Sequence, residues 1–139
     1  MKIITQNLLL YALLLLIYTV LFRFGLSSLL DAERWVWVLV IAVAYGAMIF
    51  VTAWMTGKRD GMNNFLFDAG FRWNLTTGLV WGGASEAWFL LGFHSAHETI
   101  RVVHITLLIW SGFLILHLIL FLILRRRTIK GVHKTNIFD

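Results

Sequence analysis

Four long apolar segments, separated by short polar connections, constrain this chain more than any other feature of its sequence. Hydrophobic residues make up 60% of the 139 residues, against about 45–50% in soluble domains. Only 14% of the residues are charged, and they cluster between the apolar segments, so no segment has a polar face to present to water. A lipid bilayer is the solvent that suits such a chain.

We therefore predict an all-α integral membrane protein, a four-helix bundle in which one domain comprises residues 1–139. Crossing a hydrocarbon core of about 30 Å takes roughly 20 apolar residues. The four transmembrane helices are expected at approximately 3–22, 35–55, 73–93 and 100–124. A cleaved signal peptide is the rival interpretation of the first segment, but its apolar region exceeds the usual length of about 7–15 residues, which favours a retained anchor.

The longest connection lies between the second and third segments and is expected to contain a short interfacial helix. Met62, Phe65, Leu66 and Ala69 are spaced at i, i+3, i+4 and i+7, the spacing of one apolar helix face.

The distribution of basic residues predicts the orientation, because Lys and Arg in short loops resist translocation. Lys2, Lys58, Arg59, Arg72 and the basic residues from Arg125 onward fall on one side, nine in all, against Arg23, Arg34 and Arg101 on the other. Both termini are therefore expected in the cytoplasm, with the chain a multi-pass protein of a bacterial inner (plasma) membrane. Because the net charge of +5 is concentrated beside the apolar segments, we expect anionic lipid headgroups as its partners and no nucleic acid.

Cysteine and proline are absent; the first absence excludes cysteine chemistry, and the second argues against a secondary transporter. Without cysteine the chain has no disulfide, no thiolate nucleophile and no cysteine-ligated metal. Without proline it lacks the Pro-broken helices that many secondary transporters place near their binding sites.

Glu86 is the strongest candidate for a functional residue. It lies about seven residues, or roughly 10 Å, inside the outer end of the third predicted span, where an ionisable group needs a partner or a wet cavity. Arg101 and His104 on the next helix are the expected partners across a short hairpin. A contact with His104 would form a pH-sensitive charge pair, since histidine side chains change charge near neutral pH.

Small and polar residues form a stripe on the third predicted span, at Asn74, Gly78, Gly82, Ser85 and Glu86. Gly78 and Gly82, with Gly83 beside them, are expected to allow a close approach of another helix. The stripe has two interpretations that the sequence leaves open: a helix-packing contact, or a polar path for an ion, proton or solute.

Histidines offer weaker candidates. His94, His97 and Glu98 could gather as a metal site, but their spacing matches no zinc motif and Ser95 to Glu98 has the capping-box spacing, which places Ser95 at the N-cap of the fourth helix. His104 and His117 are thirteen residues apart on one helix, a rotation of about 220°, so they cannot both ligate one haem. We expect no metal and no cofactor, and His117 is kept as a polar intramembrane candidate.

The run from Trp110 to His117, WSGFLILH, and the stretch from Phe71 to Leu75 resemble the signature of the bacterial two-transmembrane (2TM) domain family. The resemblance covers residues 71–124, and Asn74 stands where that family usually has histidine. It implies a packing or sensing hairpin, because members of the family are small membrane proteins or sensor-kinase modules without an established reaction.

The function predicted from the sequence is that of a small non-enzymatic membrane protein, an oligomeric or accessory and sensing subunit of a membrane assembly. Its partners would be other copies of the chain or other membrane subunits. The alternative is a small ion, proton or solute channel or transporter that uses Glu86 and His104. A haem- or metal-binding subunit and an enzyme come after these, since no catalytic arrangement of side chains is evident.

Overall fold

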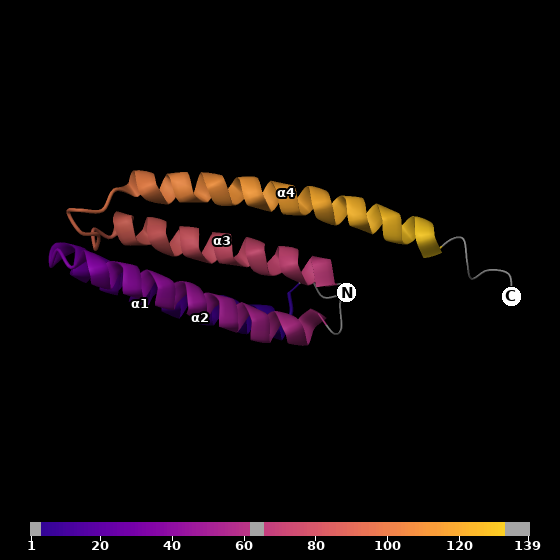
Figure 1. The fold of residues 1–139 in the computed structure, drawn as a ribbon, viewed down its shortest axis with the longest axis horizontal. Helices are drawn as coiled ribbons and strands as arrows, with labels where there is room; N and C mark the ends of the chain where they lie inside the picture. Colours follow the sequence, from indigo (N-terminus) through magenta and orange to yellow (C-terminus); the bar gives the residue numbers. More distant parts are fainter. Residues whose placement is uncertain (1–3, 62–65, 133–139) are drawn as a thin grey trace, which may run out of the picture.

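The computed structural model describes residues 4–61 and 66–132, and these form four helices in sequence. Their bounds are α1 (Gln6–Asp31), α2 (Trp35–Gly61), α3 (Leu66–Leu90) and α4 (Ile100–Val132). The connections 32–34 and 91–99 lie at the same end of the molecule, which we call the loop end, and α4 extends beyond the other helices at the opposite end (Figure 1).

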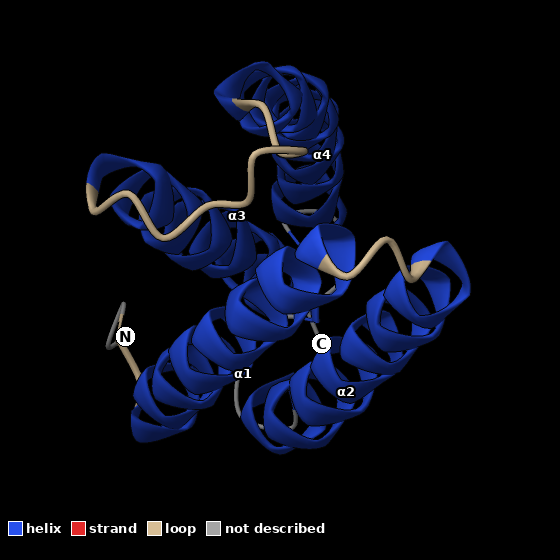
Figure 2. Cartoon of the chain, turned by 90° about the vertical axis from the view of Figure 1, so that its left-hand side faces the viewer, coloured by secondary structure: helices blue, strands red, loops and turns tan. Residues whose placement is uncertain are grey.

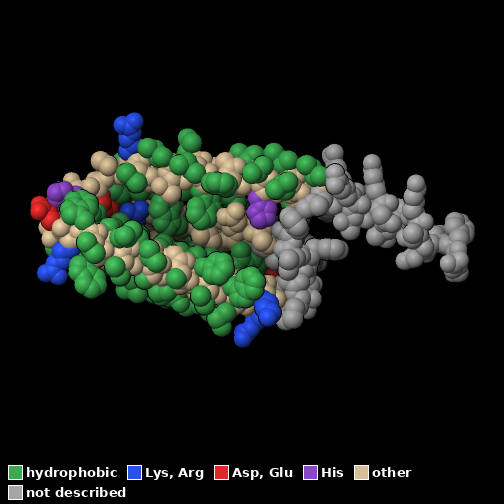
Figure 3. Space-filling model, viewed as in Figure 1, with side chains coloured by type: hydrophobic (Ala, Val, Ile, Leu, Met, Phe, Trp, Pro, Cys, Tyr) green, Lys and Arg blue, Asp and Glu red, His purple; other side chains and the backbone are tan. Residues whose placement is uncertain are grey.

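Three of the four helices are long and apolar enough to cross a membrane: α1, α2 as far as Asp60, and α4 as far as Ile123. Large apolar side chains on these helices face outward, as Val36 (74% exposed) and Leu108 (74% exposed) do. In the space-filling view such side chains cover the middle of the molecule, whereas most charged side chains gather toward its ends (Figure 3). An apolar girdle between charged ends is the surface that a lipid bilayer stabilises.

The helices do not form a closed four-helix bundle. Helices α1, α2 and α3 pack against one another, whereas α4 packs against α3 alone within the described part of the chain. Seen along the helices from the loop end, α4 lies beside α3, on the side of the molecule away from α2 (Figure 2). Helix α3 is therefore the element on which α4 depends for its position.

One face of α1 supplies most of the buried side chains. They recur every three or four residues, the period of a helix face: Leu8, Tyr11, Leu15, Thr19, Arg23, Ser27 and Leu30. Near the end opposite the loops this face packs on α3, where the Tyr11 hydroxyl is hydrogen-bonded to that of Thr77 at 2.6 Å and the Tyr11 ring stacks on Trp73. The middle of the stripe, Thr19, Arg23 and Ser27, is polar, and both of its ends are leucines.

The predicted boundaries are wrong at several helix ends: α2 and α4 run on to Gly61 and Val132, and α3 begins at Leu66 instead of residue 73. Helix α1 does not end at Phe22 but runs to Asp31, so that Arg23 lies within it. Helix α3 ends at Leu90 and not at Phe93, because Gly92 takes a left-handed conformation (φ 73°) and the Phe93 N–H bonds back to the Trp88 carbonyl, the geometry of a Schellman motif.

The prediction of a separate interfacial helix is also wrong for those of its residues that the structure describes. Leu66 and Ala69 belong to the first turn of α3, while Met62 and Phe65 lie outside the described residues. The apolar spacing of Leu66 and Ala69 is therefore that of the first turn of a long helix.

Candidate functional site

A buried network of polar side chains joins α1, α3 and the 91–99 connection near the loop end. Its centre is Arg23, which is only 5% exposed. The Arg23 Nε donates to the Ser85 hydroxyl at 3.1 Å, and Nη1 forms an ion pair with Glu98 Oε2 at 3.2 Å. The network thus connects positions up to 75 residues apart in sequence.

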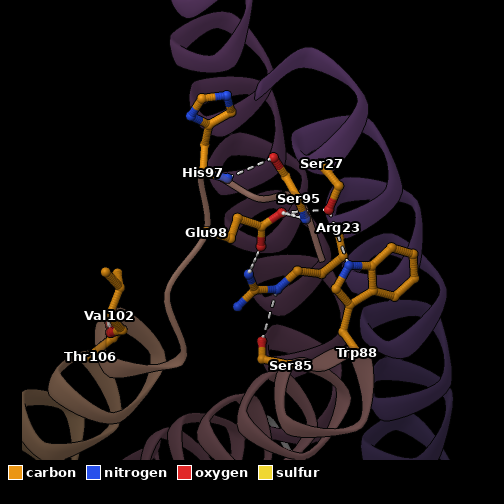
Figure 4. A network of polar contacts seen from close by, with 9 residues as sticks. All are labelled: Arg23, Ser27, Ser85, Trp88, Ser95, His97, Glu98, Val102 and Thr106. Atoms are coloured by element: carbon orange, nitrogen blue, oxygen red, sulfur yellow. Dashed lines mark hydrogen bonds and ion pairs between the residues drawn. The ribbon is translucent and has the colours of Figure 1, made fainter. Parts of the chain in front are cut away.

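The other carboxylate oxygen of Glu98 holds the connection in place. Glu98 Oε1 accepts from the Ser27 hydroxyl at 2.5 Å and from the Ser95 N–H at 3.3 Å. Trp88 Nε1 in turn donates to the Ser27 oxygen at 3.1 Å, so α3 is joined through Ser27 of α1 to the carboxylate of the connection (Figure 4). Asp31 accepts from the Ser95 hydroxyl and extends the network to the end of α1.

The electrostatics of this network are those of a buried pair of opposite charges. The Arg23 and Glu98 side chains are 7% and 6% exposed, so each has lost most of its hydration and depends on the other for compensation. The Arg23 guanidinium also lies over the Trp81 ring, with Cζ 5.5 Å from the ring centroid, where the aromatic face attracts a cation.

A cavity of about 260 Å³ adjoins this network, between α1, α3 and the start of α4. Its wall is apolar and aromatic apart from five polar residues, which are Arg23, His97, Glu98, Thr99 and Thr106. The cavity lies between α1 and α4, which do not pack against each other in the described part of the chain.

Glu86 and His104 meet, as the sequence predicts. The Glu86 Oε1 and His104 Nε2 atoms are 2.9 Å apart, with side chains 33% and 57% exposed. Because α3 ends early, Glu86 lies four residues, or about 6 Å, from its end. The pair therefore lies at the edge of the seam between α3 and α4, and the cavity is lined by neither residue.

The glycine stripe lies in this same seam. A Cβ on Gly78 would stand 3.0 Å from the Trp110 ring, and a Cβ on Gly82 would stand 2.7 Å from Leu107 Cδ2. Their lack of side chains therefore lets α4 of the same chain approach. Gly83 takes no part in this contact, since no side chain of the described residues comes within 4 Å of where its Cβ would stand.

The remaining polar candidates divide between the two faces of α3 and the outside of α4. The Asn74 carbonyl accepts from Trp110 Nε1 at 3.4 Å, and Ser85 lies in the Arg23 network. His117 packs against Gly70 and edge-on to Phe71, with ring centroids 5.9 Å apart, while Arg101 is exposed. The structure thus separates the predicted stripe into a face toward α1 and a face toward α4.

The three metal candidates point to different partners. His94 stacks on the Phe89 ring, His97 lies edge-on to Trp35, and Glu98 binds Arg23. Among residues 4–61 and 66–132 no three His, Asp or Glu side chains are grouped as a metal site.

Ser95 is not the N-cap of the fourth helix, so that prediction is wrong. Helix α4 begins at Ile100, five residues later, and the Ser95 hydroxyl accepts from the His97 N–H within the connection. The capping-box hydrogen bond from the Ser95 N–H to Glu98 is present, but it shapes a turn that presents Glu98 to Arg23.

Arg23 was not predicted as a site residue from the sequence, because a charge after an apolar run marks the usual end of a span. A signal was available in the spacing: Arg23 and Ser27 continue the four-residue period of Tyr11, Leu15 and Thr19. An arginine on the buried face of a helix requires a carboxylate partner, and Glu98 is that partner.

In comparisons with known proteins, no family model, no curated protein and no solved structure matches this chain. The resemblance of residues 71–124 to the 2TM family therefore stays a prediction.

Proposed function

We propose that all four helices cross a bacterial inner membrane, with both termini in the cytoplasm. Helix α3 has 25 residues, about 37 Å, which exceeds a hydrocarbon core of about 30 Å. Two of its polar residues face inward: Thr77 and Ser85 are 7% and 0% exposed. A helix whose polar groups are satisfied by neighbouring helices can cross a membrane despite lower hydropathy.

Within that membrane the chain acts as a non-enzymatic subunit of an assembly of its own copies. The observation that carries this proposal is the Glu86–His104 pair, which is partly exposed one turn inside the start of α4. Polar groups facing lipid are costly, and they are covered by other helices or by water. A second protein surface over this pair removes that cost.

A second copy of the chain suits this surface for two reasons. The patch carries both a carboxylate acceptor and a histidine donor, so two copies related by a twofold axis would each offer what the other binds. The adjoining face of α4 is apolar and exposed, as Phe113 (64%) and Ile115 (60%) are, and provides area for helix packing.

The oligomeric state tests this proposal. We expect single-molecule photobleaching in native membrane vesicles to count two or more copies per particle for the unaltered chain. The double variant Glu86→Leu/His104→Leu removes the polar pair that a second copy would cover. At the same density of protein in the membrane it should dissociate to single copies. Glu33→Gln removes an exposed charge at the loop end and should leave the count unchanged; single copies throughout for the unaltered chain would contradict the proposal.

The alternative function is an ion or proton path that uses the same two residues. Its support is the ionisable pair itself, and because the pair lies at the outer edge of the α3–α4 seam, such a path would run between copies. Proton flux into liposomes that Glu86→Gln abolishes, with the assembly intact, would favour this alternative over the accessory role.

A further inference from the structure

The cavity beside Arg23 has the features of a binding site for a small lipid-soluble molecule. At about 260 Å³ it is slightly below the range of roughly 300–1,000 Å³ of pockets for drug-sized ligands. It would therefore hold the head of an amphiphile or one ring system. Its wall combines Arg23 with aromatic and aliphatic side chains, including Phe22, Leu26, Trp81, Phe89 and Val102.

One donor group is directed into this cavity without a protein acceptor. A guanidinium group donates from three nitrogens, and Arg23 uses Nε on Ser85 and Nη1 on Glu98. Across the described residues, Nη2 has no hydrogen-bond acceptor, and Figure 4 shows it pointing away from the network toward Val102 and Thr106 of α4. Nη2 is thus a nitrogen left over on a residue that is only 5% exposed, and an acceptor that enters the cavity can satisfy it.

Protein side chains on the far wall do not meet this need. Thr106 lines the cavity and its hydroxyl donates to the Val102 carbonyl at 2.8 Å, but no hydrogen bond joins it to Arg23. Arg23 is held over Trp81 and bound at two of its nitrogens, so the guanidinium is fixed in place before a ligand arrives. Fixed orientation lowers the entropy cost of binding.

The charge of the site selects the kind of acceptor. Glu98 already neutralises Arg23, so an anion would bring an uncompensated charge into an apolar cavity. A neutral carbonyl oxygen can accept from Nη2 without that cost. The aromatic and aliphatic walls then accommodate an apolar ring or chain.

The route of entry agrees with this chemistry. Helix α4 stands off from α1 at the cavity, and Val102 at its rim is 61% exposed. A molecule dissolved in the bilayer can reach the cavity sideways.

We propose that this cavity binds a neutral, lipid-soluble molecule through a carbonyl oxygen that accepts from Nη2 of Arg23. The carbonyl belongs either to an ester on an acyl chain or to a quinone ring, which share this chemistry. The site is independent of the assembly proposed above, because the cavity is lined by neither Glu86 nor His104.

Native mass spectrometry of the full chain released from detergent micelles tests this proposal. Three probes are titrated in parallel: mono-oleoyl glycerol as the ester, decylbenzoquinone as the quinone, and oleate as the anion. We expect one molecule of a neutral probe per chain, bound at least tenfold more tightly than oleate. Whichever neutral probe binds more tightly identifies the source of the carbonyl, and equal binding assigns recognition to the carbonyl alone.

Two variants and one control locate the binding. Arg23→Lys keeps a positive charge opposite Glu98 but loses Nη2, and should weaken the preferred neutral probe by about tenfold or more, as the loss of a hydrogen bond to a charged group does. Val102→Trp fills the rim from an exposed position outside the network and should have an effect of similar size. Leu108→Trp makes the same change on α4 away from the cavity and should leave binding unchanged.

The proposal is overturned if neither neutral probe binds, if oleate binds more tightly than both, or if Val102→Trp and Leu108→Trp behave alike. The Val102 and Leu108 variants leave Arg23 and its partners intact, so the test does not depend on the stability of Arg23→Lys. Circular dichroism of each variant checks that its helices are present.

Discussion

Removing one partner of the Arg23–Glu98 pair should destabilise the fold far more than a surface charge would. The two side chains are 7% and 6% exposed, and Arg23 Nη1 lies 3.2 Å from Glu98 Oε2. Arg23→Met would leave the Glu98 carboxylate buried without its counter-charge, a situation that costs about 3–5 kcal/mol. The two lost hydrogen bonds, to Ser85 and Glu98, give a similar figure at about 1.5–3 kcal/mol each.

The double variant should recover much of that loss. Glu98→Gln keeps an oxygen that can accept from Ser27 while removing the charge, so Arg23→Met/Glu98→Gln buries no ion at all. We expect the double variant to lose at least about 2 kcal/mol less stability than the two single variants lose in sum. This difference is at the upper end of measured coupling energies.

Reversible unfolding in mixed micelles of dodecyl maltoside and sodium dodecyl sulfate, followed by circular dichroism, measures these free energies. Arg101→Met is the matched control, since Arg101 is exposed at the same end and its loss should change stability by no more than about 0.5 kcal/mol. Single variants that cost less than about 1 kcal/mol, or effects that simply add, would refute the buried pair as a stabilising element.

Two further predictions concern the seams on either side of α3. Gly82→Val should destabilise the chain by about 1–3 kcal/mol, because its Cβ would stand 2.7 Å from Leu107 Cδ2, whereas Gly83→Val, beside open space, should change stability by no more than about 0.5 kcal/mol in the same unfolding assay. Equal effects of the two would contradict the packing of α4 on Gly82. Tyr11→Phe removes the 2.6 Å hydrogen bond to Thr77 and should cost about 0.5–1.5 kcal/mol; a stability equal to that of the unaltered chain would show that the bond contributes nothing.

Local sequence patterns were sufficient where the interacting residues lie on neighbouring helices. The Glu86–His104 contact and the close approach at Gly78 and Gly82 follow from helical spacing on two helices joined by a short connection. The four helices themselves follow from the length of the apolar segments, with errors of several residues at their ends.

Arg23 could not be placed in the same way, because its position depends on a partner 75 residues away. Hydropathy treats an arginine as the end of a span, although a buried carboxylate can hold it inside one. Ser95 and Glu98 fit a local capping motif equally well, and only the position of α1 shows that Glu98 serves a long-range pair. The cavity depends on how far α4 stands from α1, which no local pattern encodes.

The most direct test of the account is the side of the membrane on which each connection lies. The chain has no cysteine, so single cysteines can be introduced at residues 33, 58, 94 and 130 and labelled in intact cells with a membrane-impermeant thiol reagent. Four crossings with both termini inside predict labelling at residues 33 and 94, and at 58 and 130 only after the membrane is permeabilised. Residue 94 protected in intact cells while residue 130 is labelled would mean that α3 does not cross, and would contradict the account.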